Sequence, residues 1–185
     1  MGMITVRDLP RKESREVVNG LKAMGIKVVM LTGDDLKVAE GVAADLGIEE
    51  FRARLLPQDK VRAVEELQAK HGPLLMVGDG VNDAPALAKA EIGVAMGVAG
   101  TDVALETADV ALMSDDLHSL LYGIRLSRRG AGVIRQNVSV SLAVKLALTI
   151  LTFPGLVTLW MAILIGDLGV SLAVIANALR LNRFR

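Results

Sequence analysis

Two long apolar stretches dominate the last third of the chain. Residues 133–153 and 156–181 each have about the length that a helix needs to cross a bilayer, roughly 20 residues. Pro154 and Gly155 stand between them and predict a tight turn. The alternative, two helices buried in a soluble core, needs a domain large enough to cover both, and the remaining chain is too short for that. We therefore predict a transmembrane hairpin over about 133–153 and 156–181.

Charge divides the chain into two unlike parts. Residues 131–185 contain five basic residues and one acidic residue, so residues 1–130 carry the opposite excess within a net charge of zero. The arginines lie before the first apolar stretch and near the end of the second: Arg125, Arg128, Arg129, Arg135, Arg180, Arg183 and Arg185. Segments rich in Lys and Arg beside a span stay on the cytoplasmic side. This pattern predicts that both ends of the hairpin, and the domain before it, face the cytoplasm.

Each apolar stretch contains one charged residue far from its ends. Lys145 and Asp167 lie roughly 14 and 19 Å along a helix from the turn, which places both near mid-bilayer. A snorkelling lysine or a static salt bridge would be structural explanations. Charges within a membrane more often face a protein interior and mark an ion path, and Gly166 and Gly169 leave room beside Asp167. The two residues are candidates for a transported-ion site.

The first 130 residues alternate between short apolar runs and amphipathic segments. Unbroken apolar runs predict buried parallel strands at residues 28–31, 74–77, 92–96 and 110–113. Apolar residues spaced three and four apart predict helices at residues 13–24, 36–46 and 59–69. Strands and helices in turn indicate a doubly wound, mostly parallel α/β sheet. We assign residues 1–130 to this domain and residues 131–185 to the membrane.

A glycine-loosened loop follows the strand predicted at residues 74–77. It reads Gly-Asp-Gly-Val-Asn-Asp-Ala-Pro-Ala-Leu over residues 78–87, and it places two carboxylates, Asp79 and Asp83, at the carboxyl end of that strand. Parallel sheets keep their ligand sites at this end, and Mg²⁺ prefers hard oxygen ligands. An ordinary surface turn rich in Asp, Asn and Gly is the alternative. The loop predicts a site for Mg²⁺ and phosphate.

Two further segments offer groups for a phosphate. Thr32-Gly33-Asp34 ends the strand predicted at residues 28–31 and opens a helix, so a hydroxyl and backbone amides could hold a phosphoryl group. Lys60 lies at the start of the helix predicted at residues 59–69, and by itself it is more typical of a solvated surface charge. The chain has no cysteine and no basic patch with interleaved aromatic residues. We therefore expect neither thiolate metal ligands nor nucleic acid as a partner.

These segments, in this order and spacing, resemble the phosphorylation domain of P-type ATPases, whose fold belongs to the haloacid dehalogenase superfamily. The resemblance continues through residues 95–104 and 108–112, Gln136-Asn137 and residues 177–181, and it covers essentially the whole chain. A lysine in the first span and Asp167-Leu168-Gly169 in the second are similar to the zinc-, cadmium- and lead-exporting branch. The resemblance implies ATP as substrate, Mg²⁺ as cofactor and Zn²⁺, Cd²⁺ or Pb²⁺ as the transported ion.

The resemblance also implies a role for each candidate residue. Asp79 and Asp83 would form the Mg²⁺ site, with Asp79 as the direct ligand. Asp83 and Asn82 would orient Asp79 and the phosphoryl oxygens. Lys60 would neutralise the phosphate and the attacked carboxylate. The turn after the first strand would contact the phosphoryl oxygens through Thr32 and Gly33, with Asp34 beside them. In the membrane, Asp167 would bind the transported ion and Lys145 would be its counter-charge.

Departures from the family pattern limit what the chain can do alone. The sequence contains neither the phosphorylated Asp-Lys-Thr-Gly-Thr motif nor the Cys-Pro-Cys of heavy-metal pumps, and Asp8 lacks the Asp-x-Asp pattern of related phosphatases. We expect the C-terminal part of a pump in a bacterial plasma membrane, with lipid and the missing nucleotide-binding, actuator and other transmembrane segments as partners. Alone it should not turn over. The alternatives are a membrane-anchored phosphatase of the same superfamily and a non-catalytic split-pump subunit or metal-binding hairpin.

Overall fold

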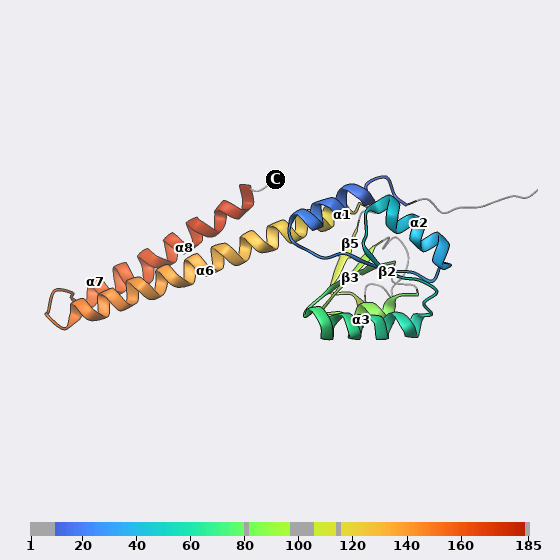
Figure 1. The fold of residues 1–185 in the computed structure, drawn as a ribbon. Coiled ribbons are helices and arrows are strands. Elements are labelled where there is room, and N and C mark those ends of the chain that lie inside the picture. Colours follow the sequence, from blue (N-terminus) through green and yellow to red (C-terminus); the bar gives the residue numbers. More distant parts are fainter. Residues whose placement is uncertain (1–9, 80–81, 97–105, 114–115, 184–185) are drawn as a thin grey trace, which may run out of the picture. The chain divides into compact units, whose positions relative to one another are not determined.

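The computed structural model describes residues 10–79, 82–96, 106–113 and 116–183. Within it the chain forms two compact units, the α/β unit of residues 1–121 and the hairpin unit of residues 122–185 (Figure 1). The sequence placed this division at residue 130. Asp8 and residues 80–81 and 97–105, which contributed to the predicted motifs, lie outside the described residues.

The α/β unit alternates helices and strands as the sequence pattern predicts. Its helices are α1 (Ser14–Ala23), α2 (Leu36–Leu46), α3 (Pro57–His71) and α4 (Ala84–Lys89). Its strands are β1 (Val29–Leu31), β2 (Glu50–Arg52), β3 (Leu75–Gly78), β4 (Ile92–Met96) and β5 (Val110–Leu112). In Figure 1, α1 and α2 lie on one side of the strands and α3 lies on the other. The predicted doubly wound α/β class is confirmed.

All strand pairs in the described part of the chain are parallel, but they form two sheets rather than one. One sheet has the order β1-β2, and Met30 is opposite Phe51. The other has the order β3-β4-β5, with Val77 opposite Val94 and Ala95 opposite Ala111. No ladder of the described residues joins β1 to β3. Each of these two strands is therefore paired along only one edge.

The core of the α/β unit lies between α3, α4 and β3. Leu87 and Ala86 of α4 pack with Val64 of α3 and Met76 of β3, and Leu31 at the end of β1 packs against this cluster. Leu87 is completely buried, and a leucine buried in this way contributes about 1.5–3 kcal/mol relative to an exposed one. This packing holds the carboxyl ends of β1 and β3 close to one another although the strands do not pair.

Local chemistry sets where these helices begin and end. The Asp35 carboxylate accepts a hydrogen bond from Lys37 N at 3.2 Å and caps α2, and Gly47 ends it at a φ of +73°. Pro57 opens α3, and the Asp59 carboxylate accepts from Leu56 N at 3.1 Å. The sequence analysis missed β2, which is only three residues long and in which two of the three residues are charged. It also missed α4, because Asn82 to Pro85 resembles a turn, although proline is well tolerated in a first helical turn.

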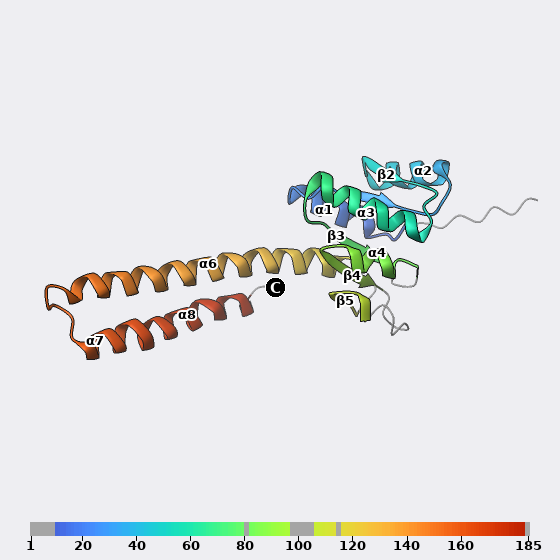
Figure 2. The same cartoon turned by 90° about the horizontal axis from the view of Figure 1, so that it is seen from below.

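The hairpin unit is built from two antiparallel helical segments that lie side by side (Figures 1 and 2). The first is α6 (His118–Thr152), which starts well before the predicted span. The second consists of α7 (Leu159–Ile163), a π-helical segment (Leu164–Gly169), α8 (Val170–Leu179) and a final 3₁₀ turn (Arg180–Arg183). The connection runs from residue 153 to residue 158, longer than the predicted tight turn, because α7 begins only where the Thr158 hydroxyl caps it.

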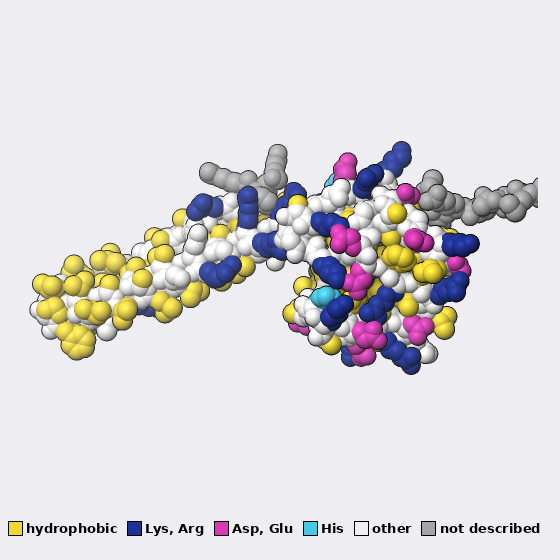
Figure 3. Space-filling model, in the orientation of Figure 1, with side chains coloured by type: hydrophobic (Ala, Val, Ile, Leu, Met, Phe, Trp, Pro, Cys, Tyr) yellow, Lys and Arg dark blue, Asp and Glu magenta, His cyan; other side chains and the backbone are white. Residues whose placement is uncertain are grey.

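Both helical segments are long and apolar enough to cross a membrane, over His118–Thr152 and Leu159–Asn182. Their most apolar windows are 0% and 6% buried within the protein. A core helix of a soluble protein would be largely covered, so the alternative of two helices in a soluble core does not describe this hairpin. In Figure 3, hydrophobic side chains cover the end of the hairpin unit that carries the 153–158 connection. The exposure of these apolar windows fits membrane-spanning helices better than core helices.

Candidate functional site

The carboxyl ends of β1 and β3 carry the residues that the sequence singled out. Thr32 follows β1 directly, and Asp79 follows β3. Lys60, in the first turn of α3, connects the two ends, because its Nζ lies 2.6 Å from Asp83 Oδ1. Since α3 starts where the β1-β2 sheet ends and Asp83 lies in the loop after β3, this ion pair joins the ligand-binding ends of both sheets.

The Lys60–Asp83 pair is largely enclosed. The two side chains are 15% and 16% exposed, so water screens their attraction only in part. The position of Lys60 depends on the start of α3, where Pro57 and the Asp59 cap fix the first turn. Asp83 in turn precedes α4 and accepts from Ala86 N and Leu87 N through its backbone oxygen. Both partners are therefore attached to elements that the core holds in place.

Gly78 permits the close approach of Asp83 to the end of β3. A Cβ at residue 78 would lie 3.0 Å from both Cβ and Oδ2 of Asp83, closer than side chains normally pack. The Asp83 carboxylate therefore lies against the backbone beside Asp79, with Oδ1 directed to Lys60. This contact gives a physical reason for the glycine that precedes Asp79.

The turn after β1 forms a compact local motif. Thr32 Oγ1 donates to Asp34 Oδ2 at 2.8 Å and accepts from Asp34 N at 3.1 Å. The backbone of the β2–α3 connection supports it, since Leu55 N donates to Thr32 O at 3.0 Å and Arg54 N donates to Asp34 O at 2.8 Å. A Cβ at Gly33 would meet Leu55 O at 3.3 Å. The threonine hydroxyl is thus held at the strand end by a backbone frame.

An ion pair beside this turn fixes the start of α2. Arg54 Nη2 lies 2.6 Å from Asp35 Oδ2. The side-chain hydrogen bond from Arg54, together with the backbone N–H of Lys37, holds the pKa of the Asp35 carboxyl below its usual range. Arg54 has a φ of +57°, a left-handed conformation that is uncommon for a residue with a side chain. This pair positions the turn and does not reach the Lys60–Asp83 pair.

The site residues predicted from sequence fall into two groups. The structure brings Lys60 together with Asp83, and Thr32 together with Asp34. Asp79 and Asn82 both have exposed side chains in the loop that Asp83 closes. Contacts within the described residues link Thr32 to its neighbour Asp34 rather than to Lys60 or Asp83. A phosphoryl group bound between the two strand ends would have to bridge these groups.

The donor set fits Mg²⁺ held together with a phosphate. The described residues contain no cluster of three or more His, Cys, Asp or Glu side chains that would hold a metal by themselves. Mg²⁺ does not need such a cage, because it usually binds through one or two carboxylates and completes its shell with water and phosphate oxygens. Asp79 is exposed at the strand end, and Asp83 is partly neutralised by Lys60. Asp79 is the more exposed of the two carboxylates.

In the hairpin unit, the two predicted intramembrane charges face each other. Lys145 Nζ of α6 lies 3.8 Å from Asp167 Oδ1. Asp167 lies inside the π-helical segment, a widened turn that is frequent at functional sites. Gly166 is buried, and a Cβ there would meet Leu148 Cδ1 at 3.0 Å, so the glycine lets the two helices approach closely beside the pair.

An amide cluster lies nearer the ends of the hairpin helices. Asn177 Nδ2 of α8 donates to Asn137 Oδ1 of α6 at 2.8 Å and to Gln136 Oε1 at 3.5 Å. Arg180 Nη1 donates to Asn177 Oδ1 at 3.1 Å. The sequence analysis recorded these residues only within the family resemblance and assigned them no role. The available signal was two adjacent amides in the first apolar stretch and one in the second, where such groups bond across helices.

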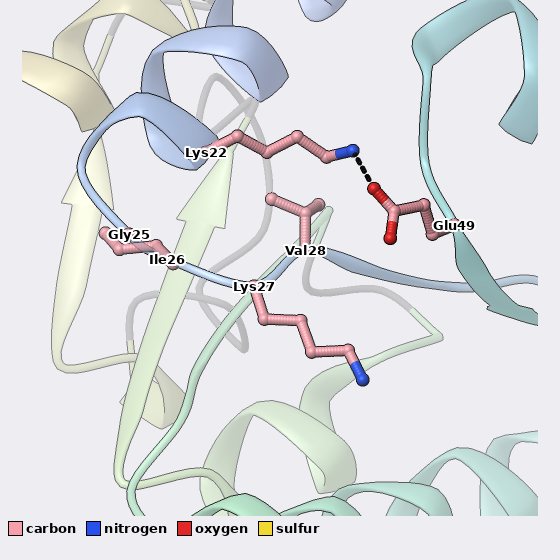
Figure 4. A pocket seen from close by; sticks show the side chains of 6 residues that line it. All are labelled: Lys22, Gly25, Ile26, Lys27, Val28 and Glu49. Atoms are coloured by element: carbon pink, nitrogen blue, oxygen red, sulfur yellow. Dashed lines mark hydrogen bonds and ion pairs between the residues drawn. The ribbon is translucent and has the colours of Figure 1, made fainter.

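A surface pocket of about 360 Å³ in the α/β unit lies apart from these residues (Figure 4). Lys22 crosses it, with Nζ 2.7 Å from both Gly47 O and Glu49 Oε1, and Lys27 pairs with Glu50. Val28, which also lines it, precedes β1, whereas Thr32 follows that strand. The pocket therefore lies at the amino end of β1, opposite the candidate site, and its lysines already have carboxylate partners.

Comparisons with known proteins agree on one family. Residues 1–91 match the haloacid dehalogenase-like hydrolases. Over 186 residues the chain is 45% identical to a probable cadmium-transporting ATPase of Staphylococcus aureus (strain MRSA252). It is 50% identical, over the same length, to a manganese-exporting P-type ATPase of Mycobacterium tuberculosis (strain ATCC 25618 / H37Rv). Each alignment covers 100% of this chain and 26% of the relative.

A solved structure extends this likeness to both units. The crystal structure of a zinc-transporting PIB-type ATPase in the E2.Pi state is 48% identical, with a TM-score of 0.89. The match covers 96% of this chain and 29% of that one. The chain thus spans about a quarter of the length of the proteins it resembles.

Proposed function

This chain belongs to the heavy-metal P-type ATPases, whose phosphorylation domain has the haloacid dehalogenase-like fold, and we propose that it contributes two half-sites to an ATP-driven exporter of divalent cations. One half-site, in the α/β unit, serves Mg²⁺ and the transferred phosphoryl group. The other, in the hairpin unit, serves the transported ion. The observation that carries the proposal is the Lys60–Asp83 pair, which joins the carboxyl ends of two separate sheets at the predicted phosphate loop.

Each residue of the first half-site has a chemical task. When bound, Mg²⁺ would offset the negative charge that develops on the transferred phosphoryl group. Asp79 would hold it, and Asp83 and Asn82 would orient that ligand. Lys60 would place a positive charge beside the phosphate and the attacking carboxylate. The Thr32 hydroxyl and the backbone at Gly33 would hydrogen-bond to phosphoryl oxygens, with the Asp34 carboxylate setting the hydroxyl's orientation.

The attacking carboxylate would come from a strand that the rest of the pump supplies. β1 and β3 run parallel to their partners and are each paired on one side only in the described residues. We infer that a further parallel strand pairs between them. A residue at its carboxyl end would then lie between Thr32 on one side and Asp79 on the other. This is where an aspartate supplied by the rest of the pump would attack the γ-phosphate of ATP, so that its carboxylate becomes phosphorylated and ADP leaves.

Phosphorylation by labelled ATP tests the first half-site. In the full-length pump we expect an acid-stable phosphoenzyme. Its level should fall at least about 100-fold in Asp79→Asn, since removing a group that stabilises the developing charge costs about 10²–10³ in the rate of the chemical step. Glu40→Gln, an exposed change on α2, is the matched control and should leave the level unchanged. The chain alone should give no phosphoenzyme. A labelled band on the chain alone would contradict the absence of a nucleophile and favour an independent phosphotransfer activity.

For the second half-site, we propose that Asp167 binds the transported ion and that Lys145 occupies it as a counter-charge when the ion is absent. The 3.8 Å separation of Lys145 Nζ and Asp167 Oδ1 supports this exchange. The relatives named above export or transport cadmium, manganese and zinc, so the family accepts several divalent ions. We propose Zn²⁺, Cd²⁺ or Pb²⁺ as the substrate of this pump, and the missing Cys-Pro-Cys segment as the source of its other ligands.

Ion-stimulated ATP hydrolysis by the full-length pump tests this assignment. Asp167→Asn should abolish stimulation by Zn²⁺ and Cd²⁺, whereas Thr149→Val, one turn from Lys145 on the same helix, should retain most of it. Lys145→Met should raise hydrolysis in the absence of added metal, because the resident positive charge is gone. Unchanged stimulation in Asp167→Asn would reject Asp167 as a ligand.

We further propose that the hairpin crosses the bacterial plasma membrane with the α/β unit in the cytoplasm. The arginines near both ends of the hairpin support this orientation. Because the chain has no cysteine, single cysteines report the topology directly. Leu156→Cys in the connection should react with an impermeant maleimide in intact cells, and Glu65→Cys on α3 only after the membrane is opened. The reverse pattern would contradict the orientation.

A further inference from the structure

Two asparagines, one on each helical segment of the hairpin unit, bond to each other and form what we call the amide clamp. Asn177 Nδ2 of α8 donates to Asn137 Oδ1 of α6 at 2.8 Å, and Asn137 Nδ2 donates to Val174 O at 3.5 Å. Both asparagines are half-buried, and all three residues belong to the hairpin unit. The two half-sites proposed above give the clamp no task.

Arg180 determines which way the hydrogen bond of the clamp runs. A guanidinium group has donors but no acceptor, so the Asn177 atom that lies 3.1 Å from Arg180 Nη1 is the oxygen, Oδ1. The Asn177 amide therefore turns its Nδ2 group toward α6, where Asn137 presents its own oxygen. The clamp is a directional contact between the helices, whereas apolar contacts have no preferred direction.

A second close contact between the helices repeats the spacing of the clamp. A Cβ at Gly166 would meet Leu148 Cδ1 at 3.0 Å, so these two residues face each other. The distance from the clamp to this contact is 11 residues on α6, from 137 to 148, and 11 residues on the other segment, from 177 to 166. Eleven residues make about three helical turns and return to the same face. The two contacts therefore define one antiparallel register.

The Lys145–Asp167 pair lies between these two contacts and depends on their register. Counted from the clamp, Lys145 is opposite Gly169 and Asp167 is opposite Ala147, so the ion pair runs diagonally between two small residues. Its Nζ and Oδ1 atoms are 3.8 Å apart. A slip of one helical turn would move one charge about 5.4 Å past the other, which is too far for an ion pair.

The clamp is the contact that such a slip would lose. The connection of residues 153–158 can extend to about 20 Å, so it does not prevent a slip of one turn. Apolar side chains would find new apolar neighbours after the slip. Asn137 would instead face Ala173 or Leu181, neither of which has a side-chain donor.

We propose that Asn137 and Asn177 are positioning residues, and that their bond keeps the two hairpin helices in register while the transported ion replaces Lys145 at Asp167. The inference rests on the proposed ion half-site. In that proposal the ion pair breaks in each transport cycle, so the pair cannot itself maintain the register. The clamp lies eight residues from Lys145 and ten from Asp167, and it stays intact when the ion pair opens.

Disulfide formation in the full chain, held in phosphatidylcholine nanodiscs, tests the register. The chain has no cysteine, so only introduced pairs react. Val144→Cys with Val170→Cys places both thiols seven residues from the clamp, at half-buried positions, and should form an intramolecular disulfide rapidly. Val144→Cys with Val174→Cys is one turn out of register and should react slowly. The loss of two maleimide adducts in the intact mass measures both initial rates.

Variants of the clamp should change the ratio of these two rates. Asn137→Leu and Asn177→Leu should each lower it about threefold to tenfold, the effect of a hydrogen bond between membrane helices. Asn137→Asp keeps the acceptor oxygen and should restore the ratio. Ser139→Leu, a matched change at an exposed residue of α6, should keep it.

Lys145→Met separates the clamp from the ion pair. It should leave the ratio at the wild-type value, because the clamp maintains the register without the pair. An unchanged ratio in both leucine variants of the clamp, or a lowered ratio in Lys145→Met, would overturn the proposal. Circular dichroism of each variant confirms that helix content is unchanged before the rates are compared.

Zn²⁺-stimulated ATP hydrolysis by the full-length pump tests whether the register serves the ion site. Asn137→Leu should raise the Zn²⁺ concentration for half-maximal stimulation about threefold to tenfold, while the phosphoenzyme level at saturating Zn²⁺ stays at the wild-type value. Asn137→Asp should restore the Zn²⁺ response. A changed disulfide ratio with an unchanged Zn²⁺ response would reject the positioning role. A wild-type pump that Zn²⁺ does not stimulate would reject the proposed ion half-site itself, a failure distinct from a register that is independent of the clamp.

Discussion

Two lysine–aspartate pairs, one in each unit, lie in contrasting surroundings. Lys60 and Asp83 are 2.6 Å apart, and their side chains are 15% and 16% exposed. Lys145 and Asp167 are 3.8 Å apart, and their side chains are 62% and 69% exposed. The first pair is enclosed by elements of its own unit. The second lies on a hairpin whose apolar surface is largely uncovered by this chain.

The contrast shows which site this chain can form by itself. The phosphate-site pair has its geometry fixed by α3, by the loop after β3 and by the core beneath them. In the intramembrane pair, Lys145 and Asp167 are held in place only by the two helical segments that carry them. The surroundings of this pair depend on lipid and on other transmembrane segments. We therefore expect substitutions in the α/β unit to lower the stability of that unit. Comparable substitutions in the hairpin unit should leave the stability of the α/β unit unchanged.

Removing a leucine side chain should give the largest difference between the two units. Leu87→Ala should lower the free energy of unfolding of the α/β unit by about 2–5 kcal/mol, because Leu87 is fully buried and a cavity remains. Leu172→Ala, at a residue 68% exposed on α8, should change it by less than about 0.5 kcal/mol. Hydrogen exchange of the β3 and β4 amides in detergent measures both. Equal effects would mean that the two units do not unfold independently.

Breaking the two ion pairs should give the next largest difference. Lys60→Met should destabilise the α/β unit by up to about 3 kcal/mol, because the Asp83 carboxylate loses its partner in a poorly hydrated position. Lys145→Met should leave the same amides unchanged, since it lies in the hairpin unit. The same exchange experiment measures both variants. An unchanged β3 in Lys60→Met would show that the pair serves only ligand binding.

Glycine substitutions sharpen the comparison within the α/β unit. Gly93→Ala should cost about 1–2 kcal/mol, since its Cβ would lie 2.7 Å from Leu87 O, a backbone atom that cannot easily move. Gly41→Ala on α2 meets nothing within 4 Å and should stabilise by about 0.5–1 kcal/mol through helix propensity. Urea unfolding followed by far-ultraviolet circular dichroism compares the two. Tolerance of alanine at residue 93 would contradict the tight packing of α4 on β4.

The smallest effect concerns pH. Hydrogen bonds from Lys22 and Lys27 lower the pKa of Glu49 and Glu50, and the bond from Arg54 lowers that of Asp35. Because the folded-state pKa values are lowered, this stabilisation is present above the ordinary values, 4.5 for Glu and 3.8 for Asp, and is lost as pH falls through the folded values.

Unfolding of the α/β unit between pH 7 and pH 3 tests this sign. A double change of Glu49→Gln and Glu50→Gln should flatten the acid end of the stability curve, whereas Glu40→Gln should not. High salt should weaken the difference, because the Glu49 side chain is 86% exposed and the Glu50 side chain is 27% exposed, so ions in solution can screen both pairs. A stability that rises on acidification would reverse the assignment.

Most of the fold could be predicted from local pattern. The apolar runs that became β1, β3, β4 and β5 are long enough to be recognised, and so are the periodic segments that became α1, α2 and α3. The misses, β2 and α4, are short elements whose residues have weak propensities and gain their structure from packing on neighbours. The functional residues could be named because motif spacing is a local property. Which of these residues contact each other could not be predicted, because Lys60 and Asp83 are 23 residues apart in the sequence.

The sequence by itself determined the class of each unit, the membrane character of the hairpin and the identity of the candidate site residues, because periodicity, apolar length and motif spacing are properties of neighbouring residues. Only the tertiary structure decided that the parallel strands form two sheets and that Lys60 joins their ends. It also decided that a π-helical segment carries Asp167 and that Asn137 bonds to Asn177 across the hairpin. These features depend on distances between residues far apart in the chain, and packing of the core and of the two hairpin helices sets those distances.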